Sequence, residues 1–292
     1  AMNDIHVVFF LLLALWMYVK MKSSKQKVFA RYLLLSGIFA GLAISTKWSG
    51  LFAILAFGCD QILSSMKAWK LPPVRIIFKM IVAWLFVPAL IYVLSYGQFW
   101  LQGHTIDQFV ELHKQIWYYQ THLTATHTYQ STPLRWVFDL RPVWYSVQYV
   151  DVNKVGNIYN LGNPVIFLGG LLCLLFIFAR CIHKFVWWKW FLFSSYCSMW
   201  MLWLFSPRIM FFYHYAPAVP MLAIALAWGV VALWKTQKLA LKILSALVVM
   251  GTLMWFAVFY PYLSGLPVST EFANKVYFAI SGSISETCSR VP

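Results

Sequence analysis

Apolar runs of about 20 residues recur along the whole chain, and they constrain its fold more than any other feature. A helix of about 20 residues crosses the hydrocarbon core of a bilayer and satisfies its own backbone hydrogen bonds there. Only 11% of the 292 residues are charged and 62% are hydrophobic, which is too little charge to cover a soluble domain. Strand-type alternation is missing, which argues against a β-barrel. The sequence therefore predicts an all-α, polytopic helical membrane protein.

Eight apolar segments are predicted to span the membrane, which gives one membrane domain with one structured outer loop. The predicted spans are 5–20, 30–46, 50–66, 77–97, 163–180, 188–206, 209–233 and 241–262. Membrane helices occupy 1–97 and 163–262, the outer loop occupies 98–162, and an outer C-terminal tail occupies 263–292.

The net charge of +15 would suit a nucleic-acid-binding protein, but its distribution argues against that class. Fifteen of the 23 basic residues fall in or beside every second connection between the predicted spans. Short cytoplasmic loops of membrane proteins carry such an excess of Lys and Arg. The charge therefore sets the orientation in the membrane, and no nucleic acid is expected as a partner. The fifteen are Lys20, Lys22, Lys25, Lys27, Arg31, Lys67, Lys70, Arg75, Lys79, Arg180, Lys184, Lys189, Lys235, Lys238 and Lys242.

The predicted outer loop 98–162 is too long for a simple connection between two helices. Apolar residues recur at intervals of three and four in its first part, which predicts an amphipathic helix over 105–121. We expect this helix to lie along the membrane surface, with the aromatic run 117–119 at the interface. The rest of the loop is rich in turn formers and aromatic residues.

Lys47 interrupts a long apolar stretch at the predicted outer turn 45–50. A lysine there could extend its ammonium group to the lipid headgroups. Alternatively, the cation is directed at an anionic ligand in the outer leaflet. Positive charge is disfavoured on this side of the membrane, so the second interpretation gives the residue a reason to be there.

The segment "SPRIMFFYHYAPAVP", residues 206–220, places Arg208, His214 and Tyr215 at another predicted outer turn. Arg208 follows a proline and is predicted to lie in the first turn of a helix, where the helix dipole is already positive. An arginine makes sense there if an anion is bound, because guanidinium, helix N-terminus and Lys47 would converge on it. The alternative is an aromatic belt at the interface.

Other outer residues carry weaker signals. Asp4 suits an N-cap of the first span and is a weak catalytic candidate. His122 and His127 are five residues apart, so they do not share a helix face, and no metal site is expected. Arg141 in "LRPVW" is a further candidate cation, although lipid headgroups would suit it equally.

Five groups of segments, in this order, carry a resemblance to a known family. They are "AMNDIHVVFFLLLALW", "GIFAGLAISTKWSGLF", "LTATHTYQS" with "LRPVWY" and "LGNPVIF", "RIMFFYHYAPAVPMLAIALAWG", and "FYPYLSGLPVS". The chain resembles the dolichyl- or polyprenyl-phosphate-mannose protein O-mannosyltransferases, which belong to the GT-C class of membrane glycosyltransferases. The resemblance covers nearly the whole chain and implies a GT-C-like membrane fold.

The resemblance implies an enzyme that takes mannose from a polyprenyl-phosphate-linked donor. A Ser or Thr hydroxyl of a secreted polypeptide attacks the anomeric carbon with inversion, and polyprenyl phosphate leaves. The implied enzyme is a multi-pass protein of the cell membrane, surrounded by membrane lipids, with its active site on the extracytoplasmic face. The lipid-linked sugar is a substrate, and no cofactor is expected.

The resemblance also suggests roles for the candidate residues. The leaving phosphate would need preorganised cations and donors, and Lys47, Arg208, His214, Tyr215 and Arg141 are of these types. The loop that contains "TATHTYQS" would cap the donor site and frame the acceptor groove, through His122, His127 and Tyr129.

The chain departs from the family pattern in several respects. The family's catalytic acidic pair lies in a first outer loop that precedes the segment "AMNDIH", so the chain is expected to be a C-terminal part that lacks this loop. A short stretch 128–162 leaves no room for a lectin-like domain, which suggests a bacterial-type member. Gln120 and Thr128 stand where relatives often have His and Pro.

Three other functions remain open at this stage. Another GT-C enzyme would share the phosphate site but transfer its sugar to a lipid or a glycan, and assays of donors and acceptors would distinguish it. A transporter would need ionisable residues at mid-bilayer or broken helices in paired repeats, whereas the nearest such residue, Asp60, lies close to a span's cytoplasmic end. The chain could also be inert scaffold as it stands.

Overall fold

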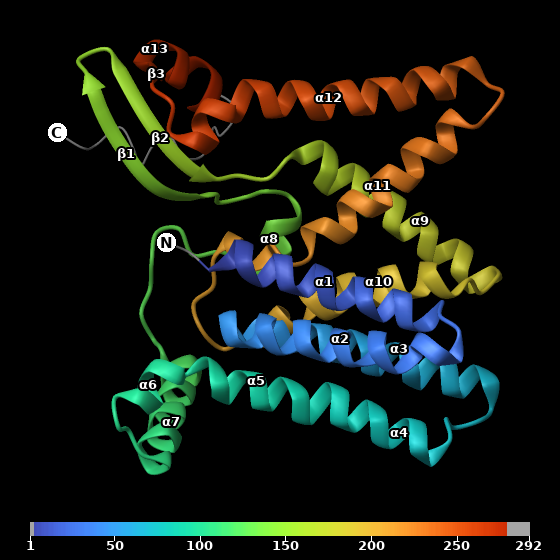
Figure 1. The fold of residues 1–292 in the computed structure, drawn as a ribbon. Coiled ribbons are helices and arrows are strands. Elements are labelled where there is room, and N and C mark those ends of the chain that lie inside the picture. The colour runs from blue at the N-terminus through green and yellow to red at the C-terminus, as the bar shows by residue number, and fades with distance from the viewer. Residues whose placement is uncertain (1–2, 279–292) are drawn as a thin grey trace. The chain divides into compact units, whose positions relative to one another are not determined.

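Long apolar helices make up most of the computed structural model, which describes residues 3–278 of the chain (Figure 1). Within these residues, six helical segments are long and apolar enough to cross a membrane, which confirms a polytopic helical membrane protein. Three of the segments are single helices: Asp4–Lys22 (α1), Gln26–Thr46 (α2) and Leu239–Ser264 (α12). Trp48–Ala68 consists of η1 (Trp48–Gly50) and α3 (Leu51–Ala68), and Val165–His183 consists of η3 (Val165–Gly169) and α9 (Gly170–His183). Val74–Ser95 consists of α4 (Val74–Ile81), η2 (Val82–Phe86) and α5 (Val87–Ser95).

The two other expected spans are shorter in the structure. The span expected at 188–206 is a helix at Trp187–Trp200 (α10), followed by a 3-10 turn at Met201–Phe205 (η4). The span expected at 209–233 is a helix at Val219–Trp234 (α11). The expected number of eight spans is therefore not confirmed.

The late start of α11 corrects the expectation that Arg208 lies in the first turn of a helix. Residues 206–211 have no helical structure, and only a short turn at Phe212–Tyr215 (η5) precedes α11. Pro217 disfavours helical backbone at the residue before it, whereas Pro220 is tolerated in the first turn of α11. The argument from a helix dipole at Arg208 was therefore wrong.

The chain forms two compact units, which are described separately. Unit 1 comprises Ala1–Ala125, Ile177–Arg208 and His214–Met221. Unit 2 comprises Thr126–Phe176, Ile209–Tyr213 and Leu222–Pro292.

In unit 1, α2 packs closely against its neighbours through two glycines four residues apart. A Cβ atom added to Gly37 would lie 1.8 Å from the backbone oxygen of Ala83, and one added to Gly41 would lie 2.9 Å from Cα of Pro88. Small residues at this spacing let the backbones of membrane helices approach closely. A larger side chain at Gly37 would therefore push η2 away from α2.

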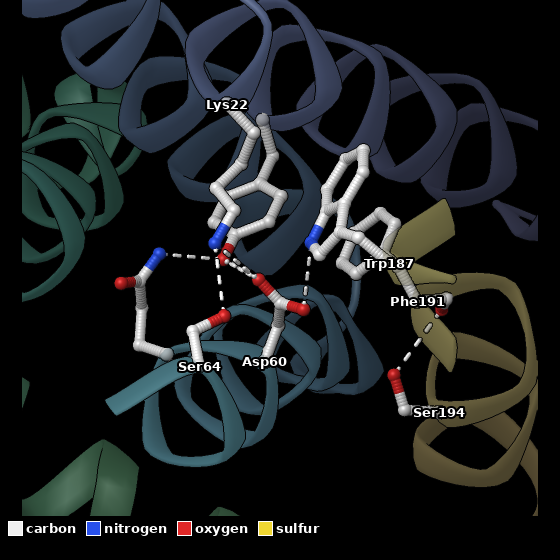
Figure 2. Close-up of polar contacts among 8 residues, drawn as sticks. Lys22, Asp60, Ser64, Trp187, Phe191 and Ser194 are labelled. Carbon is white, nitrogen blue, oxygen red and sulfur yellow. Dashed lines mark hydrogen bonds and ion pairs between the residues drawn. The ribbon is translucent and has the colours of Figure 1, made fainter. Parts of the chain in front are cut away.

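A buried carboxylate, that of Asp60, joins three helices of unit 1 (Figure 2). Tyr18 of α1 donates a hydrogen bond to Asp60 Oδ2 at 2.6 Å, and Trp187 Nε1 of α10 donates to Oδ1 at 2.9 Å. Lys22 Nζ, at the end of α1, lies 3.1 Å from Oδ2. A fully buried carboxylate is tolerated only with such partners, because desolvation of the charge is expensive.

Two further residues of α3 complete this network. Gln61 Nε2 donates to the hydroxyl of Tyr18 at 2.7 Å, and Lys22 Nζ donates to Ser64 Oγ at 3.0 Å. Both polar ends of the pair between Lys22 and Asp60 therefore have additional partners, which fixes the ends of α1 and α3 relative to each other. We call this region of unit 1 the Lys22 end.

Unit 2 contains a β-hairpin that the sequence analysis missed. Strands Val143–Asp151 (β1) and Lys154–Asn160 (β2) pair antiparallel around a two-residue turn, and Val268–Ser269 (β3) pairs with β2. Register shifts interrupt β1 near Trp144 and near Tyr149, which obscures any simple alternation in its sequence. The stretch described only as rich in turns and aromatics therefore contains a β-hairpin in its second half.

The hairpin is held by an aromatic core. The ring of Tyr159 stacks on that of Tyr262 near the end of α12 at 4.2 Å, and Tyr262 stacks on Tyr277 at 4.2 Å. Val155, Phe259 and Ala273 complete the same buried cluster. The sheet is thus stabilised by packing against α12 and the following turns, Thr270–Phe272 (α13) and Ala273–Phe278 (η6).

The expected amphipathic helix is confirmed as Ile106–His122 (α7), preceded by a short helix at Gly97–Leu101 (α6). Thr105 and Gln108 form a capping box, in which each side chain bonds to the other's backbone N–H. This fixes the start of α7. Its position along the membrane surface stays a prediction.

The arrangement of basic residues predicts which end of unit 1 faces the cytoplasm. The connections after α1, after α3 and before α10 all lie at the Lys22 end, and all are basic. We therefore expect this end to be cytoplasmic and α7 to be outside. In intact cells, an impermeant thiol reagent should label Lys114→Cys and should label Ser24→Cys only after permeabilisation. Labelling of Ser24→Cys in intact cells would contradict this orientation.

Candidate functional site

The start of α1 and the ends of α2 and α5 lie at one end of unit 1, which we call the Asp4 end (Figure 1). Polar and aromatic side chains meet there. Lys47 directly follows α2, and its extended backbone ends that helix. Its Nζ lies 2.7 Å from Oδ1 of Asp4, the first residue of α1. The side chains are 30% and 15% exposed, so the ion pair is partly shielded from solvent. Asp4 was expected to cap the start of its own helix, but it makes no such bond. Its carboxylate instead orients the ammonium group of Lys47.

The hydroxyl of Tyr92 on α5 is the centre of a second group at the Asp4 end. It lies 2.9 Å from Trp48 Nε1, 3.0 Å from the Tyr96 hydroxyl and 2.8 Å from His113 Nε2. His113 Nδ1 lies 2.7 Å from the carbonyl oxygen of Phe109 and must therefore donate to it. In neutral His113, Nε2 then accepts from Tyr92, which in turn accepts from Trp48 and Tyr96. One arrangement of hydrogens thus satisfies the whole group.

These hydrogen bonds dock α7 onto the membrane helices of unit 1. His113 lies on α7, whereas Trp48 and Tyr92 lie at the ends of η1 and α5. The ring of His113 also packs against Trp48, Tyr92 and Tyr96. Burial raises the pKa of the Tyr96 hydroxyl above its usual value, which keeps it protonated as a donor.

The docked helix carries a partner for Arg208. Gln120, in the last turn of α7, accepts a hydrogen bond from Nη1 of Arg208 through its side-chain oxygen. Arg208 is half-buried and lies in the non-helical segment 206–211. Its guanidinium group is therefore positioned by α7, and not by a helix of its own.

His214 belongs to the same region through a row of aromatic rings. It is 3% exposed, and its ring meets that of Trp203 edge-on at 4.5 Å. Trp203 in turn meets Phe52 at 5.6 Å, in the first turn of α3 and five residues after Lys47. A row of packed rings thus leads from His214 to Phe52, which lies near Lys47 in the sequence.

Tyr215 is also buried, at 1% exposed, and its hydroxyl lies 2.8 Å from that of Tyr196 on α10. A belt of interfacial aromatics would expose its rings to the membrane surface. The burial of His214 and Tyr215 therefore argues against the belt interpretation of "FFYHY". The hydroxyl of Tyr215 faces the protein interior and supports η5.

Of the other predicted residues, His122, His127 and Arg141 are exposed and Tyr129 is half-buried. His122, in unit 1, stacks on Tyr118 at 4.3 Å. In unit 2, the ring of His127 contacts Phe211 at 5.4 Å and Tyr129 at 5.7 Å. Arg141 Nη1 donates to the carbonyl of Thr128 at 3.0 Å and so holds the turn that carries His127 and Tyr129.

Asp139, in unit 2, is an acidic residue that sequence reasoning did not single out as a site. It follows the short helix Pro133–Val137 (α8) and has a left-handed backbone, with φ +54°. The amide of Gly162 donates to both carboxylate oxygens at 3.1 Å. Burial raises the pKa of Asp139 to about 7, although the bond from Gly162 opposes this shift. The side chain closes the outer loop onto the start of the following span.

Four of the missed residues had signals that could have been noticed. Tyr92 and Tyr96 are four residues apart, so they share a helix face and can act together. His113 lies on the apolar face of α7, where a polar residue needs a partner. Asp139 is isolated within the aromatic stretch "WVFDLRPVWY".

Two family models match the chain, and together they extend from its start to residue 279. The model described as dolichyl-phosphate-mannose-protein mannosyltransferase matches residues 1–105. The model described as the C-terminal four-transmembrane region of protein O-mannosyltransferase matches residues 105–279. The chain belongs to the protein O-mannosyltransferase family. This confirms the resemblance found in the sequence.

Curated bacterial members of the protein O-mannosyltransferase family are similar along most of the chain. A polyprenol-phosphate-mannose–protein mannosyltransferase of Mycobacterium tuberculosis is 24% identical over 82% of this chain and 55% of its own length. One of Mycolicibacterium smegmatis is 25% identical over 80% of this chain and 54% of its own length. The chain therefore spans about half the length of these relatives.

A solved structure of a Saccharomyces cerevisiae protein O-mannosyltransferase complex bound to the sugar donor is also similar. It shares 22% identity over 59% of this chain and 26% of that chain, with a TM-score of 0.48.

The docking of α7 in this protein O-mannosyltransferase can be tested at Tyr92. Tyr92→Phe removes the shared hydroxyl and leaves Trp48 Nε1 and His113 Nε2 without it, at a cost of about 1–3 kcal/mol for each unsatisfied group. Amide hydrogen exchange over Ile106–His122 should accelerate. Tyr119→Phe, on the exposed side of the same helix, is the control and should leave exchange unchanged. Equal protection in all three proteins would contradict the docking role.

The raised pKa of Asp139 predicts a pH dependence of stability. The folded protein retains a proton on this carboxyl that the unfolded chain has lost, so the contribution of Asp139 to stability is full below about pH 4. It is lost as the pH rises through about 7. Asp139→Asn imitates the protonated form, so its Tm should fall less than that of the wild type between pH 5 and pH 8. Identical pH profiles in the two proteins would show that Asp139 ionises normally.

Proposed function

We propose that the full-length protein transfers mannose from a polyprenyl-phosphate-linked donor to Ser or Thr hydroxyls of secreted proteins, with inversion at the anomeric carbon. The observation that carries the proposal is the match of both protein O-mannosyltransferase models, over residues 1–105 and 105–279. The names of the mycobacterial relatives support the same donor and a protein acceptor.

Lys47 and Arg208 are proposed to bind the donor phosphate. In this reaction the phosphate gains negative charge as the bond to the sugar breaks, so fixed cations stabilise the transition state more than the ground state. The structure supports this role because each cation is held by a neighbour: Lys47 by Asp4, and Arg208 by Gln120 on the docked helix α7. Cations that are already oriented do not need to reorganise when the charge develops.

His214 and Tyr215 are proposed to support this phosphate site from the interior. Both are buried, and their rings are packed against Trp203 and Tyr196. The hydroxyl of Tyr215 is bonded to that of Tyr196, which orients it within this site.

A carboxylate must accept the proton of the attacking hydroxyl. Asp4 is at the right end of unit 1, but its Oδ1 is bonded to Lys47. We therefore assign Asp4 to the orientation of Lys47.

The acceptor polypeptide is proposed to meet the outer loop. His122, His127 and Tyr129 are suited to this because His122 and His127 are exposed and all three present rings or hydrogen-bonding groups. The bond from Arg141 to Thr128 favours a role in shaping the turn, with contact to the donor phosphate as the alternative. In this account the protein is a multi-pass protein of the cell membrane, and the reaction takes place on its extracytoplasmic face.

Turnover of polyprenyl-phosphate-mannose by full-length variants tests the phosphate site. Arg208→Ala should cost about 2–4 kcal/mol of transition-state stabilisation, the scale of one preorganised donor. Arg208→Lys keeps the charge but not the planar fork, so it should restore only part of the activity. Gln120→Ala keeps the guanidinium group but removes the side chain that accepts its hydrogen bond. This variant should therefore lose less activity than Arg208→Ala.

The matched control is Arg31→Ala, an exposed arginine near the start of α2, which should retain full activity. The loss in Arg208→Ala should appear in kcat if the contact tightens as the phosphate leaves, and in KM if it binds only the ground state. Near-wild-type turnover by Arg208→Ala would exclude this residue from the site. Transfer to a glycan or lipid acceptor in place of a peptide would indicate another GT-C reaction.

A further inference from the structure

A second binding feature lies at the Lys22 end of unit 1, away from the Asp4 end. A groove of about 600 Å³ opens between the last turns of α3 and the first turns of α4. Its walls are almost wholly apolar, and Ile62, Met66, Leu71, Ile77 and Met80 line it. Lys70, in the connection between the two helices, lies at the groove as well.

The surroundings of this groove carry positive charge that no nearby acid in the sequence offsets. Lys67, Lys70, Arg75 and Lys79 lie within the same short region, and the first three are exposed. No Asp or Glu occurs between Asp60 and Asp107. Asp60 itself is fully buried, with its oxygens bonded to Tyr18, Trp187 and Lys22, so it is not directed at the groove (Figure 2).

One wall of the groove is fixed by the buried network. Gln61 lines the groove and also donates to the hydroxyl of Tyr18, which is bonded to Asp60. The last turns of α3 are therefore held against α1 and α10, and the groove does not depend on a ligand to shape that wall. At its edge, Trp69 has a left-handed backbone, with φ +48°, and the residue is 95% exposed. Tryptophan is typical of the interface between membrane and water.

We propose that this groove binds an anionic phospholipid of the leaflet at the Lys22 end. An acyl chain lies along the apolar wall, against Ile62, Met66 and Ile77, and the headgroup phosphate lies against Lys70 and Arg75. A soluble polar ligand would gain almost nothing from such apolar walls, whereas a lipid matches both the walls and the charge. Basic pockets beside membrane helices on the cytoplasmic side bind anionic headgroups in this way.

The headgroup is tested by charge reversal in the full-length protein. The protein is placed in bilayer discs of phosphatidylcholine with phosphatidylglycerol as the minor component, and the lipids that it retains on release are identified by native mass spectrometry. The wild type should retain phosphatidylglycerol, enriched about tenfold over its share of the disc. The double variant Lys70→Glu with Arg75→Glu should lose this enrichment. The control variant, Lys235→Glu with Lys238→Glu, makes the same change of charge in the connection before α12. It should retain the enrichment of phosphatidylglycerol.

The acyl chain is tested separately, by filling the groove. Ser65 lines the groove, and Ser65→Phe should reduce the retained lipid about tenfold by occupying the path of the chain. Cys59→Phe adds an aromatic ring at an exposed position on α3 outside the groove and is the matched control, with no change expected.

Three results would overturn the proposal. The first is that the wild type shows no preference for phosphatidylglycerol over phosphatidylcholine. The second is that the enrichment falls in the Lys235→Glu, Lys238→Glu control as much as in the Lys70→Glu, Arg75→Glu variant. This would indicate that anionic lipid is attracted to basic loops in general. The third is that the folded protein retains no lipid, which would mean that another part of the full-length protein fills the groove.

Discussion

The carboxylate of Asp60 is the interaction on which the arrangement of unit 1 depends. A charged group that is fully buried must be paired and hydrogen-bonded, and its partners here come from α1 and α10. Removing Asp60 would leave Lys22 without its counter-charge and Trp187 without an acceptor. Three apolar helices, which could otherwise slide against each other, are thereby fixed at one end. The close contact of Gly37 with η2 sets the distance to the next helix.

Because the Lys22 end is fixed, the Asp4 end can hold polar groups in defined positions. The chain places α7 there and docks it by the hydroxyl of Tyr92, and the far end of α7 then holds Arg208 through Gln120. Lys47 is held independently by Asp4. Two cations on different segments are thus each oriented by a neighbouring side chain.

The sequence predicted well those elements that depend on residues close together in the chain, namely the long apolar helices and α7. Length and hydropathy found the six long helices, and apolar spacing found α7 almost to its ends. The start of α11 was missed because the apolar run continues through the prolines of 206–220. The hairpin was missed because its strands are irregular and are held by α12, about 100 residues later in the chain. Lys47 was found from its position alone, but Asp4, 43 residues away, could not be identified as its partner.

The most direct test of the central claim is to locate the phosphate. A structure of the full-length protein with polyprenyl phosphate, determined by electron cryo-microscopy, would show which residues contact it. We predict a phosphate within hydrogen-bonding distance of Lys47 Nζ and the Arg208 guanidinium, with α7 docked onto Tyr92 through His113. A phosphate bound elsewhere, with Lys47 still bonded to Asp4 and Arg208 still bonded to Gln120, would contradict it.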